Sequence, residues 1–171
     1  MPDHFKLANV IPIHKRDSVI CMNNYRPVSL LSSFNKILEK LVHKRLVNFI
    51  DKYNILYVNQ FGFREQHSTM HTTLLITDKN QRAIEYGLFS CGIFIDLSKA
   101  FDTAVHSILI RKLSHYGIRG IVNDWFTSYL HNRRKHVSIG STKSDDIVIT
   151  NGGPQGSVLG PLLFLLYIND L

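Results

Sequence analysis

The segment Phe94-Ile-Asp-Leu-Ser-Lys-Ala-Phe-Asp102 places an acidic residue, Asp96, directly after apolar residues. It continues a short apolar run, Cys91–Ile95, which predicts a buried strand that ends abruptly at Asp96. A carboxylate at the end of a buried strand projects from the sheet edge into a crevice, where it could hold a hard cation. Mg²⁺ favours one or two carboxylates together with substrate phosphate oxygens. The alternative interpretation is that Asp96 only caps the turn that follows the strand.

A second informative segment, Gly152-Gly-Pro-Gln-Gly-Ser-Val-Leu-Gly160, lies near the other end of the chain. Its glycines allow the backbone to approach a ligand closely just before a helix N-terminus. Gln155 is the one long polar side chain in this loop, and its amide can both donate and accept hydrogen bonds. The alternative is an ordinary connection between a hairpin and a helix.

Around these two segments, strands and helices alternate. The spacing of apolar residues predicts helices over 34–50, 68–86, 104–116 and 121–130, and an apolar helix that ends near Tyr167. Residues 8–15 read as a strand that Pro12 restricts to an edge or an early position, and 135–140 with 145–150 as a hairpin. This order predicts an α+β or α/β class with helices packed on a small sheet.

Composition limits the function classes. The 171 residues carry 20 Lys+Arg against 13 Asp+Glu, a net charge of +7 that favours a polyanionic partner. An apolar content of 44% excludes disorder as the main state. Two cysteines are too few for a disulfide framework or a Cys-rich zinc site and suggest a reducing, intracellular setting. We expect no signal peptide, because no charged-then-apolar N-terminal segment precedes a small-residue cleavage site. We also expect no membrane span, because the longest apolar run is shorter than about 18 residues.

Individual charged residues carry weaker signals. The cluster Arg133-Arg-Lys135 is more often a solvated turn than a binding site, and Asp102 and His106 are expected to cap a helix. His67 and His71 have metal-ligand spacing but lack the Glu of a zinc signature, so no zinc site is expected.

In this order and at this separation, the motifs make the chain similar to a known family. The sequence resembles the reverse transcriptase domain of non-LTR (LINE-type) retrotransposons, close to the jockey-like group. The resemblance extends over residues 8–171 and is carried by these blocks: Asn24-Tyr-Arg-Pro-Val-Ser-Leu-Leu31, Ile37-Leu-Glu-Lys40, Gln60-Phe-Gly-Phe-Arg64, His67-Ser-Thr69, Phe94-Ile-Asp-Leu-Ser-Lys-Ala-Phe-Asp-Thr103, Pro154-Gln-Gly-Ser-Val-Leu-Gly-Pro161 and Tyr167-Ile-Asn-Asp-Leu171.

The resemblance implies an RNA-directed DNA polymerase with an α+β fold, in which helices pack on a small, mostly antiparallel sheet. Residues 1–90 would form the fingers and residues 91–171 a partial palm of a right-hand polymerase, with the thumb and endonuclease domains absent. The implied partners are an RNA template, a DNA primer and deoxynucleoside triphosphates, and no protein partner is indicated. The intact family member would use two Mg²⁺ (or Mn²⁺) ions for phosphoryl transfer.

The resemblance also implies roles for individual residues. Asp96 would be the first catalytic, metal-binding carboxylate, with the Leu97 carbonyl completing its side of the metal shell. Phe101 would exclude a ribose 2′-hydroxyl by steric clash. The alternative is that Phe101 is only an aromatic residue of the core. The remaining nucleotide-binding positions would be Lys15, Arg26, Lys99, Ala100 and Gln155, of which Lys15 and Arg26 would clamp the triphosphate. Template contacts would come from Arg64 and Gly156, with a solvated surface role as the alternative for Arg64.

One departure from the family limits this expectation. The family's paired Asp-Asp block follows the segment that ends here at Leu171, whereas Asp145-Asp146 precedes the Gly-Pro-Gln loop. Because one carboxylate cannot hold two ions, we expect that this chain by itself does not polymerise DNA. Two alternatives remain. One is a catalytically dead remnant that only binds RNA or RNA–DNA hybrid. The other is an intron-type maturase, but the Ser-Val-Leu-Gly-Pro motif after the Gln loop argues against it. Priming at chromosomal DNA would require the nucleus, yet no basic run is a convincing import signal.

Overall fold

A small mixed sheet forms one side of the molecule. The computed structural model describes residues 1–97 and 100–170. Its strands are β1 (Leu7–His14), β2 (Tyr25–Leu30), β3 (Arg133–Ile139), β4 (Thr142–Lys143) and β5 (Ile147–Ile149). The strand order is β2-β1-β3-β4, and β5 also pairs with β3. The β1–β3 pair is parallel and the other pairs are antiparallel, which confirms the predicted α+β class with a mostly antiparallel sheet.

The predicted helices are present with small shifts of their ends. They are α1 (Ser33–Lys52), α2 (Thr69–Glu85), α3 (His106–His115), α4 (Ile121–Leu130) and α5 (Gly160–Ile168), with short 3₁₀ turns at Asp3–Lys6, Met22–Asn24 and Ala100–Asp102. Ser32 caps α1, because its hydroxyl accepts a hydrogen bond from the Asn35 N–H at 3.2 Å. No helix in the described part of the chain is both long and apolar enough to cross a membrane.

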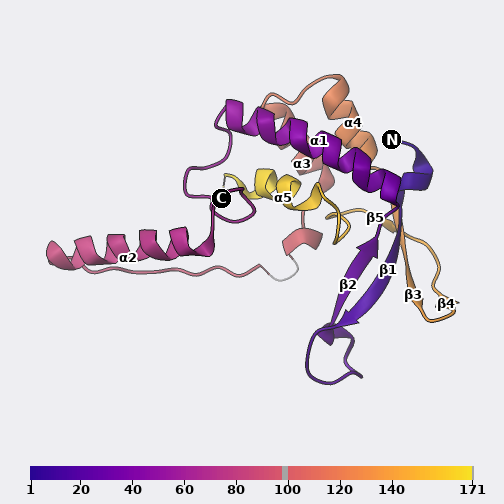
Figure 1. The fold of residues 1–171 in the computed structure, drawn as a ribbon, viewed down its shortest axis with the longest axis horizontal. Coiled ribbons are helices and arrows are strands. Elements are labelled where there is room, and N and C mark those ends of the chain that lie inside the picture. Colours follow the sequence, from indigo (N-terminus) through magenta and orange to yellow (C-terminus); the bar gives the residue numbers. More distant parts are fainter. Residues whose placement is uncertain (98–99, 171) are drawn as a thin grey trace.

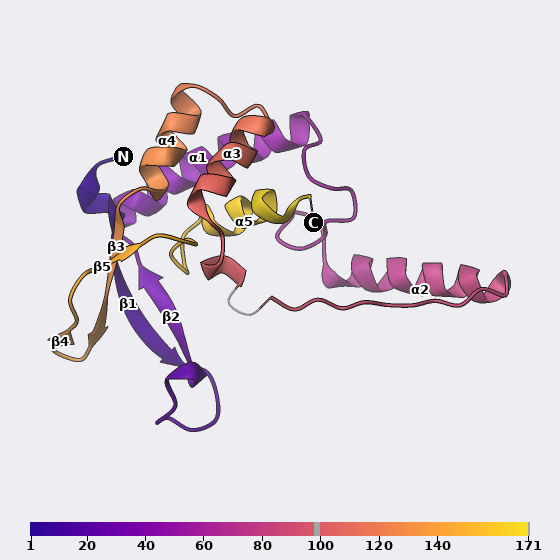
Figure 2. The same cartoon turned by 180° about the vertical axis from the view of Figure 1, so that it is seen from behind.

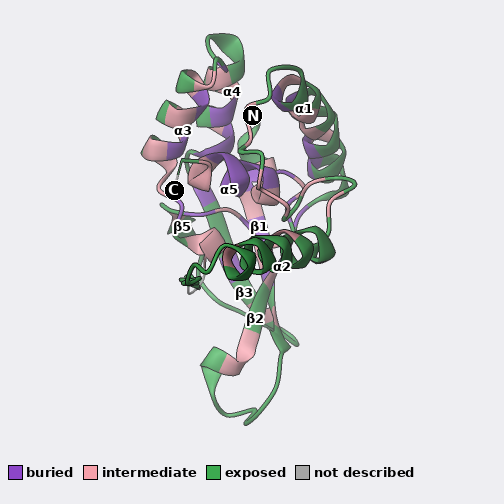
Figure 3. Cartoon of the chain, turned by 90° about the vertical axis from the view of Figure 1, so that its left-hand side faces the viewer, coloured by how far each residue is buried: buried purple, intermediate pink, exposed green. Residues whose placement is uncertain are grey.

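The core lies where α3, α4 and α5 meet the C-terminal half of α1. It contains Ile50 from α1, Leu113 from α3, Phe126 from α4 and Leu166 from α5. Figure 3 shows these helices clustered at one end, with their buried faces toward each other. Helix α2 buries none of its residues and projects away from the rest of the molecule (Figure 1). One core is therefore shared by helices from both ends of the sequence.

Strand β1 is not at an edge of the sheet. It lies between β2 and β3, and Pro12 is in the second half of Leu7–His14, so the prediction that Pro12 restricts the strand to an edge or an early position is wrong. Strand β3, however, pairs only with Leu7–Val10, and Pro12 faces Pro27 of β2 alone. The missing N–H of Pro12 therefore leaves no gap in the β1–β3 ladder.

The prediction of a buried strand over Cys91–Ile95 is also wrong. These residues form an extended chain that runs back alongside α2 (Figures 1 and 2), and Ile93, Phe94 and Ile95 are 84%, 88% and 82% exposed. An apolar run becomes a strand only where a neighbouring strand supplies hydrogen bonds. No strand within residues 1–97 and 100–170 pairs with this segment.

Asn169, just after α5, ties the loop that follows α1 to the core. Its Oδ1 accepts from the Tyr57 N–H and its Nδ2 donates to the Ile55 carbonyl, both at 2.8 Å. We expect Asn169→Ala to lower the free energy of unfolding by about 1–2 kcal/mol, because two backbone groups lose their partners. Urea unfolding measures this loss, and hydrogen exchange at the Tyr57 amide should accelerate. Unchanged exchange at Tyr57 would contradict this role of Asn169.

Candidate functional site

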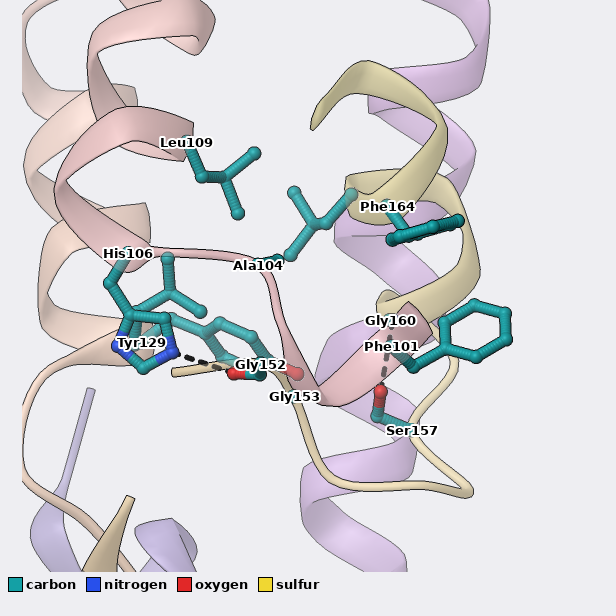
Figure 4. A pocket seen from close by; sticks show the side chains of 12 residues that line it. Phe101, Ala104, His106, Leu109, Tyr129, Gly152, Gly153, Ser157, Gly160 and Phe164 are labelled. Carbon is teal, nitrogen blue, oxygen red and sulfur yellow. Dashed lines mark hydrogen bonds between the residues drawn. The ribbon is translucent and has the colours of Figure 1, made fainter. Parts of the chain in front are cut away.

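The two segments singled out in the sequence lie side by side. The Gly152 N–H donates to the Ala104 carbonyl at 2.7 Å, and the Gly153 N–H donates to the Phe101 carbonyl at 3.3 Å. An isolated antiparallel bridge joins Val105 to Asn151. Figure 4 shows the start of the glycine-rich loop against the 3₁₀ turn that carries Phe101. Residues about fifty positions apart in the sequence thus form one structural unit.

The Phe101 ring lies between two other aromatic rings. Its centroid is 4.8 Å from that of Phe164 on α5 and 5.6 Å from that of Phe63 in the loop before α2. The residue is half-buried, and Figure 4 shows the Phe101 and Phe164 rings close together. Phe101 therefore packs as an aromatic residue at the periphery of the core while part of it stays accessible.

A small cavity lies behind this unit. It measures about 20 Å³, and its lining includes Ala104, Leu109, Tyr129 and Leu163 (Figure 4). Ligand pockets for drug-sized molecules are usually about 300–1,000 Å³. This cavity has room for about one water molecule and cannot hold a nucleotide.

His106 fastens the glycine-rich loop rather than capping a helix. Helix α3 begins at His106, its N-cap is Val105, and no side chain caps it. The His106 Nε2–H donates to the Gly152 carbonyl at 2.6 Å. Asp102 lies in the preceding 3₁₀ turn, and its Oδ2 is 3.5 Å from Nε2 of Gln155. The predicted capping roles of Asp102 and His106 are wrong because the helix starts later than the spacing suggested.

Gln155 and Gly156 are held against β2. The Ser29 N–H donates to the Gln155 carbonyl at 2.8 Å. Gly156 has φ of +108°, and a Cβ built there would lie 3.0 Å from the Ser29 carbonyl oxygen. A side chain at position 156 would therefore crowd the neighbouring strand.

The two predicted triphosphate-binding cations lie at the hairpin formed by β1 and β2. Arg26 is exposed on β2, paired with Ile13, and Lys15 follows β1, with its N–H donating to the Asn24 carbonyl at 2.8 Å. Arg26 precedes Ser29 by three residues, which corresponds to about 10 Å along a strand. Strand β2 therefore links Arg26 to the Gln155 loop, whereas Lys15 lies beyond the end of β1.

Asp96 and Leu97 are exposed on the extended chain that leads toward the 3₁₀ turn. Ala100 begins that turn, and Lys99 lies outside the described residues. No group of three or more His, Cys, Asp or Glu side chains assembles anywhere in residues 1–97 and 100–170. Asp96 can offer a carboxylate to one cation, but the described residues do not gather the further carboxylates that a two-ion site needs.

Arg64 lies next to the aromatic contact. Its Nη1 donates to the Gln60 carbonyl at 3.4 Å, and the preceding residue, Phe63, touches Phe101. Arg64 also lines a cavity of about 370 Å³ together with His43 and Lys44 of α1. The recess near the candidate site therefore combines the basic Arg64 and Lys44, the titratable His43 and two acidic side chains, Asp51 and Glu65.

A buried polar network that was not predicted from the sequence lies beside the glycine-rich loop. Glu39 and Arg133 are fully buried, and the Arg133 guanidinium lies 4.7 Å above the Tyr129 ring and donates to the Tyr129 carbonyl at 3.2 Å. The interpretation of Arg133 as part of a solvated turn is therefore wrong. A signal for Glu39 existed, because it precedes Leu46 and Ile50 by 7 and 11 residues, on the same face of α1.

Because of Tyr129, the free energy of unfolding should fall at alkaline pH. Burial, and next the charge of Glu39, raise the pKa of Tyr129 well above its usual value near 10. The unfolded chain therefore releases this proton before the folded chain does, so stability is full below about pH 10 and falls above it by up to about 1.4 kcal/mol per pH unit. We expect urea unfolding between pH 8 and 10.5 to show a larger loss for the wild type than for Tyr129→Phe. Equal losses would contradict this origin.

Comparisons with known proteins identify the family. The reverse transcriptase (RNA-dependent DNA polymerase) family matches residues 13–171. Two relatives come from Drosophila melanogaster. The probable RNA-directed DNA polymerase from transposon BS is 36% identical, and the RNA-directed DNA polymerase from mobile element jockey is 35% identical. Each alignment covers 99% of this chain and 19% of the relative.

A more distant relative extends the comparison to another element. The Pol polyprotein from type-1 retrotransposable element R2 of Popillia japonica is 27% identical, over 87% of this chain and 20% of its own length. The chain thus spans about a fifth of the length of the curated relatives it matches. It belongs to the reverse transcriptase family and is homologous to the RNA-directed DNA polymerases of non-LTR retrotransposons.

Proposed function

We propose that this chain is the part of an RNA-directed DNA polymerase that binds the incoming deoxynucleotide and the template. The observation that carries the proposal is the pairing of residues 101–105 with 151–153, which puts Phe101 and Gln155 into one unit. In a retrotransposon polymerase this unit would add deoxynucleotides to a DNA primer on an RNA template.

Each side chain of the unit has a proposed task. Gln155 contacts the nucleotide through its amide, and the exposed part of the Phe101 ring excludes a ribose 2′-hydroxyl. Lys99 and Ala100 precede Phe101 in the same motif and are proposed to line the nucleotide site. The Arg26 guanidinium binds the triphosphate, with Lys15 as a second cation, because guanidinium binds phosphate oxygens in a bidentate way.

Reverse transcriptases use divalent metal ions, and Asp96 is the residue we propose as a ligand. Its exposed carboxylate, with the Leu97 carbonyl beside it, offers the oxygen ligands that Mg²⁺, or Mn²⁺ in its place, prefers. The two-ion arrangement of an intact polymerase needs carboxylates beyond those that the described residues bring together. A bound ion would supply charge neutralisation at the phosphates.

The template and the domain names complete the proposal. Arg64 and Gly156 are proposed to contact the template, Arg64 from the recess that it shares with His43 and Lys44. Residues 1–90 would correspond to the fingers and residues 91–171 to a partial palm. The proposed site of action is intracellular, in the nucleus where reverse transcription is primed on chromosomal DNA.

Nucleotide selection tests this proposal. A chimera in which residues 1–171 replace the aligned segment of the jockey polymerase should extend a DNA primer on an RNA template. In that chimera Phe101→Val should raise ribonucleotide relative to deoxynucleotide incorporation at least tenfold, because the smaller side chain leaves room for the 2′-hydroxyl. Phe63→Val is the control, since it removes a neighbouring ring but not the proposed gate. Equal selectivity in wild type and Phe101→Val would contradict the proposal.

A second candidate function, for the 171-residue chain by itself, is nucleic-acid binding without catalysis. The observations behind it are that Asp96 is the one carboxylate proposed as a metal ligand and that no metal-binding cluster assembles among the described residues. We expect the chain to bind RNA–DNA duplex with an affinity that falls steeply with salt, and to show no primer extension. Measurable extension by the purified chain would contradict this expectation.

A further inference from the structure

Glu39 connects three separate elements at the base of the glycine-rich loop. Its Oε1 accepts from Asn35 Nδ2 at 3.1 Å within α1 and from the Tyr129 hydroxyl of α4 at 2.9 Å. Its Oε2 accepts from the Val158 N–H at 2.6 Å, a short contact with the loop itself. The carboxyl group has no exposed surface. Among the hydrogen bonds of the described residues, this is the one that joins α1 to the loop.

Packing alone does not account for a carboxyl group at this position. Leu46 and Ile50 continue the same face of α1, so an apolar side chain would fit the pattern of the helix. Burying a carboxyl group is costly unless it is paired and hydrogen-bonded. Arg133 is buried as well, with its guanidinium 4.7 Å from the centre of the Tyr129 ring, but no ion pair joins it to Glu39 among the described residues. The Glu39 carboxyl is paired through its hydrogen bonds, of which the one to Val158 reaches the glycine-rich loop.

The loop backbone is held at Gln155 and on both sides of it. Before it, the Gly153 N–H donates to the Phe101 carbonyl at 3.3 Å, and at Gln155 the Ser29 N–H of β2 donates to the carbonyl at 2.8 Å. After it, Glu39 accepts from the Val158 N–H at 2.6 Å. Ser157 turns the chain between them, with its N–H donating to the Pro154 carbonyl at 3.0 Å. With the backbone anchored before and after Gln155, its side chain starts from a fixed position, and its Nε2 lies 3.5 Å from the Asp102 Oδ2.

We infer that Glu39 is a positioning residue, which sets the Gln155 loop for the incoming nucleotide through its bond to the Val158 N–H. This inference rests on the proposed nucleotide-binding function of Gln155. Coupling between two events is reciprocal. If the bond to Val158 favours nucleotide binding, then nucleotide binding must strengthen that bond by the same factor.

Substitutions in the 171-residue chain separate positioning from stability. The probe is deoxythymidine triphosphate with Mg²⁺, titrated into the chain bound to a poly(rA) template and a primer with a dideoxy 3′ end. Glu39→Met should weaken nucleotide binding about tenfold or more, within the usual range of coupling between sites. Tyr129→Phe is the matched control, since it removes another hydrogen bond of Glu39 but leaves the one to Val158, and should stay within about twofold of wild type. Glu39→Gln, which keeps an acceptor, should restore part of the affinity.

A measurement on the unsubstituted chain covers the case in which Glu39→Met fails to fold. Addition of the triphosphate should slow hydrogen exchange of the Val158 amide about tenfold, as reciprocity requires. Unchanged exchange at Val158 despite nucleotide binding, or equal weakening by Glu39→Met and Tyr129→Phe, would overturn the inference and leave the proposed function standing. Absence of triphosphate binding by the wild-type complex would overturn both.

Discussion

Gly152→Ala is expected to lower the free energy of unfolding by about 3 kcal/mol or more, from the sum of left-handed backbone strain and overpacking. Gly152 has φ of +70°, and a Cβ there would lie 2.5 Å from both the Asp102 Cα and the Phe101 carbonyl oxygen. Backbone atoms cannot move aside as a flexible side chain can. The substitution must therefore separate the glycine-rich loop from the 3₁₀ turn that carries Phe101. Urea unfolding of the purified chain measures the effect.

Gly153→Ala provides the matched control for this prediction. The neighbouring glycine has no heavy atom within 4 Å of a Cβ built on it, and its φ lies outside the left-handed region. Its alanine variant should keep the stability of the wild type to within about 1 kcal/mol. Similar stabilities for the two variants would show that the loop does not pack on the turn as described.

Phe126→Ala is expected to cost about 3–5 kcal/mol, as for other large aromatic side chains removed from cores. Phe126 is 0% exposed on α4, in the cluster that joins α1, α3 and α5. Its ring contacts Trp125 edge-on, with centroids 5.2 Å apart. Since the same cluster supports α5, which directly follows the glycine-rich loop, its loss should weaken nucleotide binding as well as stability.

The control for Phe126 lies on the same helix. Ile121 is 87% exposed, so Ile121→Ala removes an apolar side chain that contributes little to the core. Its effect on the free energy of unfolding should stay within about 0.5 kcal/mol. A loss for Phe126→Ala no larger than that for Ile121→Ala would contradict the described core.

Helix positions and the family could be predicted from the sequence because both rest on local patterns. The spacing over residues 34–50 placed α1 correctly, and its C-terminal half buries Leu46 and Ile50 as expected. In its N-terminal half the apolar residues do not mark the buried face, since Phe34 and Leu41 are exposed while Glu39 is buried. Apolar spacing cannot reveal a polar residue that is buried because distant chain segments satisfy it.

The candidate site could be predicted only as two separate motifs. That the Phe101 turn pairs with the Gly152 loop, and that His106 fastens this contact, depends on tertiary hydrogen bonds that no local pattern encodes. The prediction of a strand over residues 91–95 was wrong because local composition alone was used. The composition of this segment favours a strand, but strand formation depends on a partner that is not among the described strands.

Primer extension by the jockey chimera carrying Asp96→Asn tests the central claim most directly. Asparagine keeps the size of the side chain but loses its charge, so extension on an RNA template should fall about a thousandfold, equivalent to about 4 kcal/mol of transition-state stabilisation. Asp145→Asn, an exposed carboxylate near β5, should leave the rate within about twofold. Extension by the Asp96→Asn chimera at the rate of the unsubstituted chimera would contradict the assignment of this chain's Asp96 to the polymerase site.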